Sequence, residues 1–218
     1  MFQSTWTRWS GLAGMLGGGA FVLALLGSIL INDNTSSGTA SPVALLLSAL
    51  VLPAILLMIG GLTGLQARRL GGGGAPGAIA FAVALTGLIL LFLGLGGQLI
   101  EMTGGSPVSG AWNLFITGLF GLVLGMVGFA VAGWRAGLLS RRHVLPVLGG
   151  GLAATAMLLL SIGGYDLMTE DQRNLLNVIA LSGLVVFMAG WVAIHHRLWT
   201  SVGNTHPGEI SGSNVVAG

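Results

Sequence analysis

The chain contains no cysteine and few charged residues. Without cysteine it can form no disulfide, no thiolate nucleophile, no thiolate-ligated metal site and no S-palmitoyl anchor. Only 6% of its 218 residues are charged, whereas 54% are hydrophobic. About a quarter of the residues in soluble domains are charged, so this composition excludes a water-soluble globular protein.

Long apolar runs make up most of the chain. Each is about 20 residues or longer and free of Asp, Glu, Lys and Arg, which matches a hydrocarbon thickness of about 30 Å at about 1.5 Å per helical residue. The runs are Gly11 to Ile31, Val43 to Leu65, Gly77 to Ile100, Trp112 to Gly133, Leu145 to Tyr165 and Leu175 to Ile194. They predict an all-α fold, a polytopic transmembrane bundle of six helices over residues 1–199.

Stretches that contain Arg and Gly precede the first, third and fifth runs, which suggests three tandem helical hairpins. The alternative is that any six-span protein with positive inner loops looks threefold. Residues 200–218 mix Ser, Gly, Asn and Pro, a composition that predicts a disordered cytoplasmic tail.

The first run has a second interpretation, as the core of a signal peptide. Arg8 precedes it, and Gly38-Thr39-Ala40 is a small-x-small site of the kind that signal peptidase accepts. Because the run is longer than the roughly 7 to 15 residues of a typical signal core, we expect an uncleaved first span.

The basic residues fall on alternate loops. Seven of the eight lie on one side, and only Arg173 lies on the other. Since positive loops stay in the cytoplasm, we expect both termini there, in the inner membrane of a bacterium. The seven are Arg8, Arg68, Arg69, Arg135, Arg141, Arg142 and Arg197. All six tryptophans fall near predicted span ends, as an interfacial aromatic belt requires.

Glycine is over-represented, at 39 of 218 residues, against about 7% in average proteins. Small residues let helices approach closely in lipid. A face of Gly118, Gly121, Gly125 and Gly128 recurs at helical spacing and predicts packing within the bundle or between subunits. A pore or groove lined by bare backbone is the alternative. Further packing candidates are Gly14, Gly18, Gly60 and Gly64.

Pro53 lies in the middle of the second run. It removes the intrahelical hydrogen bond to Ala49 and presses on that carbonyl, so the sequence predicts a kink. Kinks occur in inert bundles as well as in gates, and we favour a structural role.

The loop after the fourth run carries Arg135, Arg141 and Arg142, which we expect to be attracted to anionic lipid headgroups. Three arginines are fewer than the roughly 4 to 8 basic residues that mark specific lipid recognition, so a general surface attraction is expected.

His195 and His196 follow the sixth run. Adjacent helical residues point about 100° apart, so this pair cannot chelate one metal as an i, i+4 pair could. We expect both to anchor the helix at the interface. A metal or haem site completed by His143 is the alternative.

Catalytic patterns are missing from the sequence. The six runs offer no carboxylate or histidine for proton or sodium coupling. There is no Gly-x-Ser-x-Gly, His-Glu-x-x-His or Walker sequence, and the run Gly71 to Gly74 lacks the Lys and Ser/Thr of a phosphate loop, so we expect a flexible connection there. We therefore expect no enzyme, no cofactor and no bound metal.

The stretches Arg8 to Gly14 and Gly61 to Arg69, each leading into or out of an Ala/Leu/Gly-rich span, resemble uncharacterised multi-span membrane proteins of bacteria. In hairpin count the chain is also similar to the six-span acid-stress membrane proteins of the HdeD type, whose aromatic-rich hairpin motifs it lacks. Neither resemblance implies an activity.

Together these observations favour a non-catalytic structural, accessory or stress-related membrane component. Its expected partners are the lipid bilayer and either a second copy or another membrane protein, and nothing supports nucleic-acid binding. The alternative is a passive channel or facilitator for a small neutral solute, with the glycine faces lining the path and Pro53 at a bend.

Overall fold

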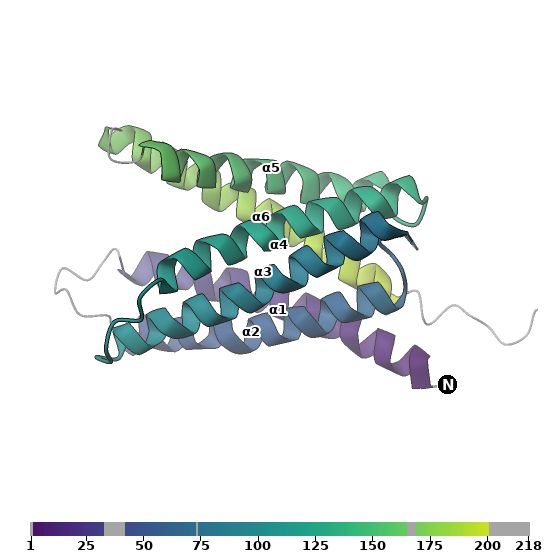
Figure 1. Cartoon of the computed structure of the whole chain (residues 1–218), viewed down its shortest axis with the longest axis horizontal. Helices are drawn as coiled ribbons and strands as arrows, with labels where there is room; N and C mark the ends of the chain where they lie inside the picture. Colours follow the sequence, from purple (N-terminus) through teal and green to yellow (C-terminus); the bar gives the residue numbers. More distant parts are fainter. Residues whose placement is uncertain (1, 33–41, 73, 165–168, 201–218) are drawn as a thin grey trace, which may run out of the picture.

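The structure is a computed structural model that describes residues 2–32, 42–72, 74–164 and 169–200. These residues form six helices and no strand, so the predicted all-α class is confirmed (Figure 1). The helices are α1 (Phe2–Asn32), α2 (Pro42–Ala67), α3 (Ala75–Met102), α4 (Ala111–Arg135), α5 (Arg141–Gly164) and α6 (Glu170–Thr200). The predicted signal-peptidase site and residues 201–218 of the predicted tail lie outside the described residues.

Four of the helices are, within the described residues, long and apolar enough to cross a membrane. Their apolar segments are Leu45–Ala67, Ala75–Met102, Ala111–Arg135 and Glu170–Thr200. Length and composition therefore identify a membrane protein.

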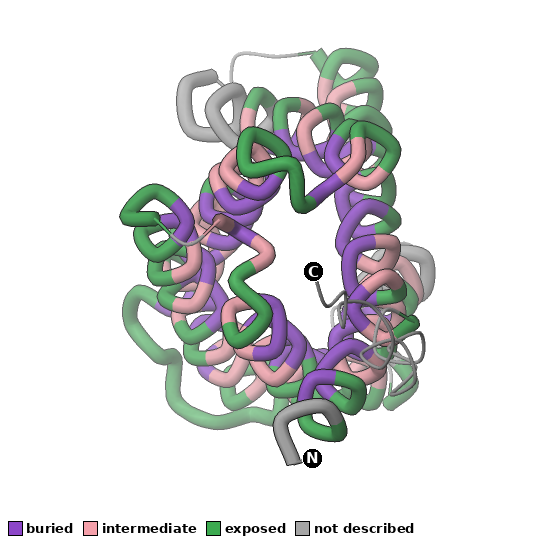
Figure 2. Tube along the Cα trace, turned by 90° about the vertical axis from the view of Figure 1, so that its right-hand side faces the viewer, coloured by how far each residue is buried: buried purple, intermediate pink, exposed green. Residues whose placement is uncertain are grey.

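The six described helices form a ring in which each packs on its neighbours in sequence, and α6 closes the ring on α1 (Figure 2). The three hairpins α1/α2, α3/α4 and α5/α6 make the most extensive contacts. Buried residues face inward along the ring and exposed residues face outward. The inward side chains join in one apolar core with members from every helix, including Phe21, Met58, Leu91, Met126, Val147 and Phe187.

The connection from α4 to α5 shows how local sequence sets a helix end. Gly137 follows α4 with a φ of 71°, a left-handed conformation that favours glycine. Its N–H donates to the carbonyl of Trp134, and the N–H of Leu138 donates to the carbonyl of Gly133, both at 2.9 Å. These are the two hydrogen bonds of a Schellman motif, and they reverse the chain within a few residues.

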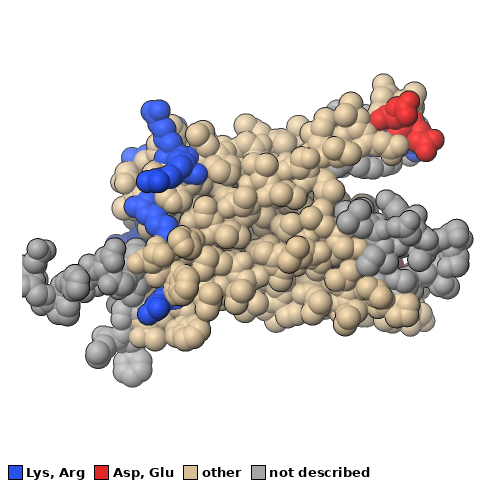
Figure 3. Space-filling model, turned by 180° about the vertical axis from the view of Figure 1, so that it is seen from behind, with Lys and Arg blue, Asp and Glu red and all other residues tan. Residues whose placement is uncertain are grey.

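Charge is segregated between the two ends of the molecule (Figure 3). Arginines gather at one end, which we call the arginine end. It contains the start of α1, the end of α4, the start of α5 and the end of α6. The end of α3, which carries Glu101, and the start of α6, which carries Glu170 and Asp171, lie at the opposite end (Figure 1).

Candidate functional site

The interior of the described bundle has three buried polar side chains, those of Thr7, Ser10 and His195. Thr7 and Ser10 belong to α1 and His195 to α6, so all three lie where these neighbouring helices meet near the arginine end. His195 is completely buried, with 0% of its surface exposed. It is the one ionisable side chain among them.

The imidazole of His195 is fixed by its own helix. Its Nδ1 donates to the carbonyl oxygen of Trp191, 2.8 Å away, and its ring stacks on the indole with a centroid distance of 4.5 Å. Because a carbonyl can only accept, Nδ1 carries the proton and Nε2 is a bare acceptor in the neutral ring. Nε2 lies close enough to the backbone of Gly61 to interact with it electrostatically, but outside hydrogen-bonding geometry, and it has no donor among the described residues.

Glycines on two other helices make room for this ring. A Cβ added to Gly14 of α1 would overlap the imidazole, and one added to Gly61 of α2 would lie 2.8 Å from Nε2. Trp191 ties the helices together, since its Nε1 donates to the carbonyl oxygen of Gly14 at 2.8 Å. An added Cβ at Gly18 would lie 2.7 Å from the Trp191 ring. The three helices therefore meet around one histidine and one tryptophan.

Ser10 occupies the same interface one turn nearer the arginine end. Its hydroxyl donates to the carbonyl oxygen of Thr7 at 2.8 Å. A Cβ at Gly64 of α2 would overlap the Ser10 side chain. The hydroxyl is satisfied locally, so the His195 Nε2 is the buried acceptor of this junction that lacks a donor.

The expected interfacial role of His195 is wrong. The predicted sixth span ends at Ile194, whereas α6 continues to Thr200 and keeps His195 inside the bundle. Its burial follows the periodicity of the inward face of α6, made up of Leu184, Phe187, Met188, Trp191, Ile194, His195 and Leu198. That spacing, read beyond the end of the apolar run, is the signal that would have found it. Trp191 is likewise fully buried rather than interfacial.

His196 points away from His195, as adjacent helical positions require, and is exposed. It lines a groove of about 600 Å³ together with His143 of α5. The rest of the groove is apolar and is formed by α1 and α6. The structure thus separates the two adjacent histidines and brings His196 together with His143.

His143 lies at the start of α5, ahead of the predicted fifth span. Its Nδ1 lies 2.5 Å from the hydroxyl of Ser140, which leaves Nε2 as the other ring nitrogen. Burial lowers the pKa of His143 from its usual value of 6.5, and the positive charges of Arg197, Arg142 and His196 lower it further. An anion placed among these groups would counteract the lowering of the His143 pKa by the three positive charges.

The predicted glycine face of α4 lies against α3. An added Cβ at Gly118 would overlap the backbone of Leu91, and one at Gly125 would overlap that of Ala84. A Cβ at Gly121 would lie 2.9 Å from the Cα of Gly87. Gly128 is looser, with 3.2 Å to the Cβ of Ala80. This glycine face therefore packs α4 against α3 within one chain.

The further packing candidates fall into two groups, one closely packed and one open. Gly14, Gly18 and Gly64 have the close contacts at the α1, α2 and α6 junction described above, whereas a Cβ at Gly60 would meet only the Cβ of Ala13, at 4.0 Å. Beside Gly64, the closely packed glycine of α2 is therefore Gly61 and not Gly60, and sequence reasoning missed it.

Pro53 and the predicted headgroup arginines lie on the outside. Pro53 is exposed, and α2 continues as one helix through it. Arg135, Arg141 and Arg142 are exposed at the arginine end, and the guanidinium of Arg141 lies 5.9 Å from the centre of the Trp134 ring. Such a cation–π contact suits the membrane interface, where arginine and tryptophan both favour the headgroup level.

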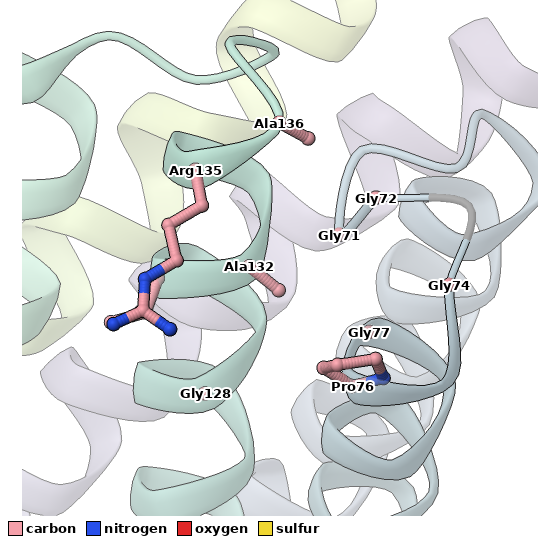
Figure 4. Close-up of a pocket in the computed structure, with 10 residues that line it drawn as sticks. Gly71, Gly72, Gly74, Pro76, Gly77, Gly128, Ala132, Arg135 and Ala136 are labelled. Atoms are coloured by element: carbon pink, nitrogen blue, oxygen red, sulfur yellow. The ribbon is translucent and has the colours of Figure 1, made fainter.

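The glycine run between α2 and α3 borders a second cavity, of about 500 Å³ (Figure 4). Ala132 of α4 and Ala136, which follows the helix, point toward this turn, whereas the Arg135 side chain extends along α4 away from it. The expected flexible connection is wrong for Gly71, which is buried: an added Cβ there would lie 2.5 Å from the Phe129 ring. The first residue of the run therefore serves close packing.

Chemically, the junction around His195 offers one nitrogen lone pair and no second ionisable group. Within the described residues, no cluster of three His, Cys, Asp or Glu side chains could hold a metal ion. Comparison with known proteins gave no matching family model, no matching curated protein and no matching solved structure.

Proposed function

We propose that the chain is a six-span protein of a bacterial inner membrane, with both termini in the cytoplasm, that acts as a non-catalytic structural, accessory or stress-related component. The segregation of charge between the two ends of the bundle carries the topological part of the proposal. The helix ends that carry most of the arginines lie together on one side of the bundle, which suits the cytoplasmic leaflet. The tight pairing of α1 with α2 and of α5 with α6 supports counting α1 and α5 as spans.

The use of glycine supports a packing role. The faces on α1, α2 and α4 that could have lined a path are covered by neighbouring helices of the same chain. Large apolar side chains such as Met58, Met126 and Phe129 fill one continuous core. Pro53 lies on the outer surface, away from this core. These contacts favour a self-contained bundle over a passive facilitator.

The lack of cysteine makes the topology easy to test, because each introduced cysteine is unique. Ser106 and Leu138 are exposed in turns at opposite ends. We expect a membrane-impermeant maleimide to label Ser106→Cys in intact spheroplasts and Leu138→Cys only after lysis. Exposed Glu170 and Gly74 give a second pair, for the α5–α6 and α2–α3 connections. Labelling of Leu138→Cys in intact spheroplasts would overturn the proposed orientation.

A flux assay tests the functional part. Purified protein in proteoliposomes should produce no solute-dependent swelling beyond that of protein-free vesicles. Reproducible swelling with a small neutral solute would overturn the structural role and would favour the facilitator.

A further inference from the structure

The groove that contains His143 and His196 runs over α6, which packs on both α1 and α5. Its α6 side consists of Val185, Met188, Ala189, Val192, Ala193 and His196. On α1 it is bordered by Gly18, Gly19, Val22 and Leu23. Leu23 is 72% exposed and Val185 39%, so the groove opens outward, toward lipid in a membrane-spanning bundle.

The shape of the groove suits a hydrocarbon chain. Gly18, Gly19, Ala189 and Ala193 line its middle, and because they carry little or no side chain they leave room for an acyl chain. From His196 to Val185 it extends about 16 Å along the helix, at about 1.5 Å per residue. That length is about half of a hydrocarbon core of about 30 Å, the depth of one leaflet.

The charge of the groove is concentrated at one end. His143 and His196 line it at the arginine end, and Arg142 and Arg197 are close enough for their charges to act on His143. The other end of the groove, around Leu23 and Val185, lies farther from the arginine end and is apolar. A ligand with an anionic head and a hydrocarbon tail matches this division, because basic pockets between spans bind anionic headgroups.

We propose that this groove binds one anionic phospholipid of the leaflet at the arginine end. Its acyl chain lies along α6 over Gly19 and Ala189, and its phosphate lies against His143 and His196 within the field of Arg142 and Arg197. The proposal rests on the membrane-spanning orientation proposed above. It adds a defined binding site to the general headgroup attraction expected for the loop arginines.

Gly19 provides a variant that blocks the groove without disturbing the bundle. An added Cβ there meets no atom within 4 Å, so Gly19→Leu should fill the groove while leaving helix contacts intact. Gly149→Leu is the matched control, because Gly149 is equally open and lies on α5 outside the groove.

The test is native mass spectrometry of protein released from nanodiscs that contain equal amounts of phosphatidylglycerol and phosphatidylcholine. The wild type and Gly149→Leu should retain one phosphatidylglycerol, at least several-fold in excess of phosphatidylcholine. Gly19→Leu should lose most of it. Equal retention of the two lipids by the wild type, or equal phosphatidylglycerol retention by the two variants, would overturn the proposal.

A charge variant separates the headgroup from the chain. The double variant Arg142→Gln/Arg197→Gln should retain lipid but lose the preference for phosphatidylglycerol. Arg68→Gln/Arg69→Gln removes the same charge at the end of α2 and should keep the preference. Unchanged selectivity in the first pair would contradict the assigned headgroup site. Failure to enter nanodiscs at all would instead contradict the proposed membrane span arrangement.

Discussion

In the α3/α4 hairpin, glycines of one helix face the backbone of the other, whereas at the junction of α1, α2 and α6 several glycines face large side chains of a third helix. Gly118 lies against the backbone of Leu91. Gly14 and Gly18 instead lie against the rings of His195 and Trp191. Glycine brings backbones together in the hairpin, whereas at the junction Gly14 and Gly18 also make room for aromatic rings.

The difference determines what each region can tolerate. A backbone cannot move aside without moving its helix, so an added methyl group in the hairpin separates two spans. A side chain can be shortened by mutation, so crowding at the junction can be relieved by a second substitution. The junction also contains the buried histidine and the hairpin does not.

The largest effect is expected in the hairpin. Gly118→Ala places a Cβ against the backbone of Leu91 and the carbonyl of Gly87, and overpacking of this kind costs about 1–3 kcal/mol of unfolding free energy. Thermal unfolding in detergent, followed by tryptophan fluorescence, should show a lowered midpoint. Gly96→Ala on α3 is the control, because its Cβ enters open space and should leave the midpoint unchanged or raise it. Equal loss in both variants would remove the distinction.

A smaller effect is expected from His195→Phe. The substitution keeps an aromatic ring on Trp191, removes the Nε2 atom, which has no donor among the described residues, and loses the hydrogen bond from Nδ1 to the Trp191 carbonyl. Removing the unpaired atom costs nothing and the lost hydrogen bond is worth about 1 kcal/mol, so the free energy of unfolding should fall by about 1 kcal/mol or less. Exposed His196→Phe is the control in the same unfolding assay. A loss of several kcal/mol in His195→Phe alone would show that Nε2 has a partner.

The smallest effect concerns the pH dependence at His143. Because the pKa of the folded protein is lowered from 6.5, the unfolded chain binds the proton more readily, and stability should fall as the pH drops below 6.5 toward the lowered pKa. In neutral detergent, the wild type should lose more thermal stability between pH 7.5 and 5.5 than His143→Gln does. An identical pH dependence of the two proteins would contradict this assignment.

Much of the fold could be predicted from the sequence, because crossing a bilayer requires apolar length and leaves charges at the ends. The glycine face from Gly118 to Gly128 was visible for a similar reason, since it combines small size with helical spacing. These features depend on one helix and its solvent.

The rest depends on how each helix is rotated about its axis. In lipid a span is apolar on every side, so hydropathy does not show which side faces the partner. Hydropathy therefore does not show that His195 faces inward, or that Gly61 packs closely while Gly60 does not. Neighbouring helical positions point about 100° apart, so an error of one residue selects a different side of the helix. The groove joining His143 to His196 depends on the packing of three helices, which no single stretch of sequence encodes.

Two double-mutant cycles, measured side by side by thermal unfolding, test the central distinction most directly. Combining Gly14→Ala with His195→Ala should restore part of the stability that each change loses, with a coupling of about 1 kcal/mol or more, because the three atoms nearest to the added methyl all belong to the removed ring. Combining Gly118→Ala with Leu91→Ala should show coupling within about 0.5 kcal/mol, since the clash is with backbone. Equal coupling in the two cycles would contradict the account.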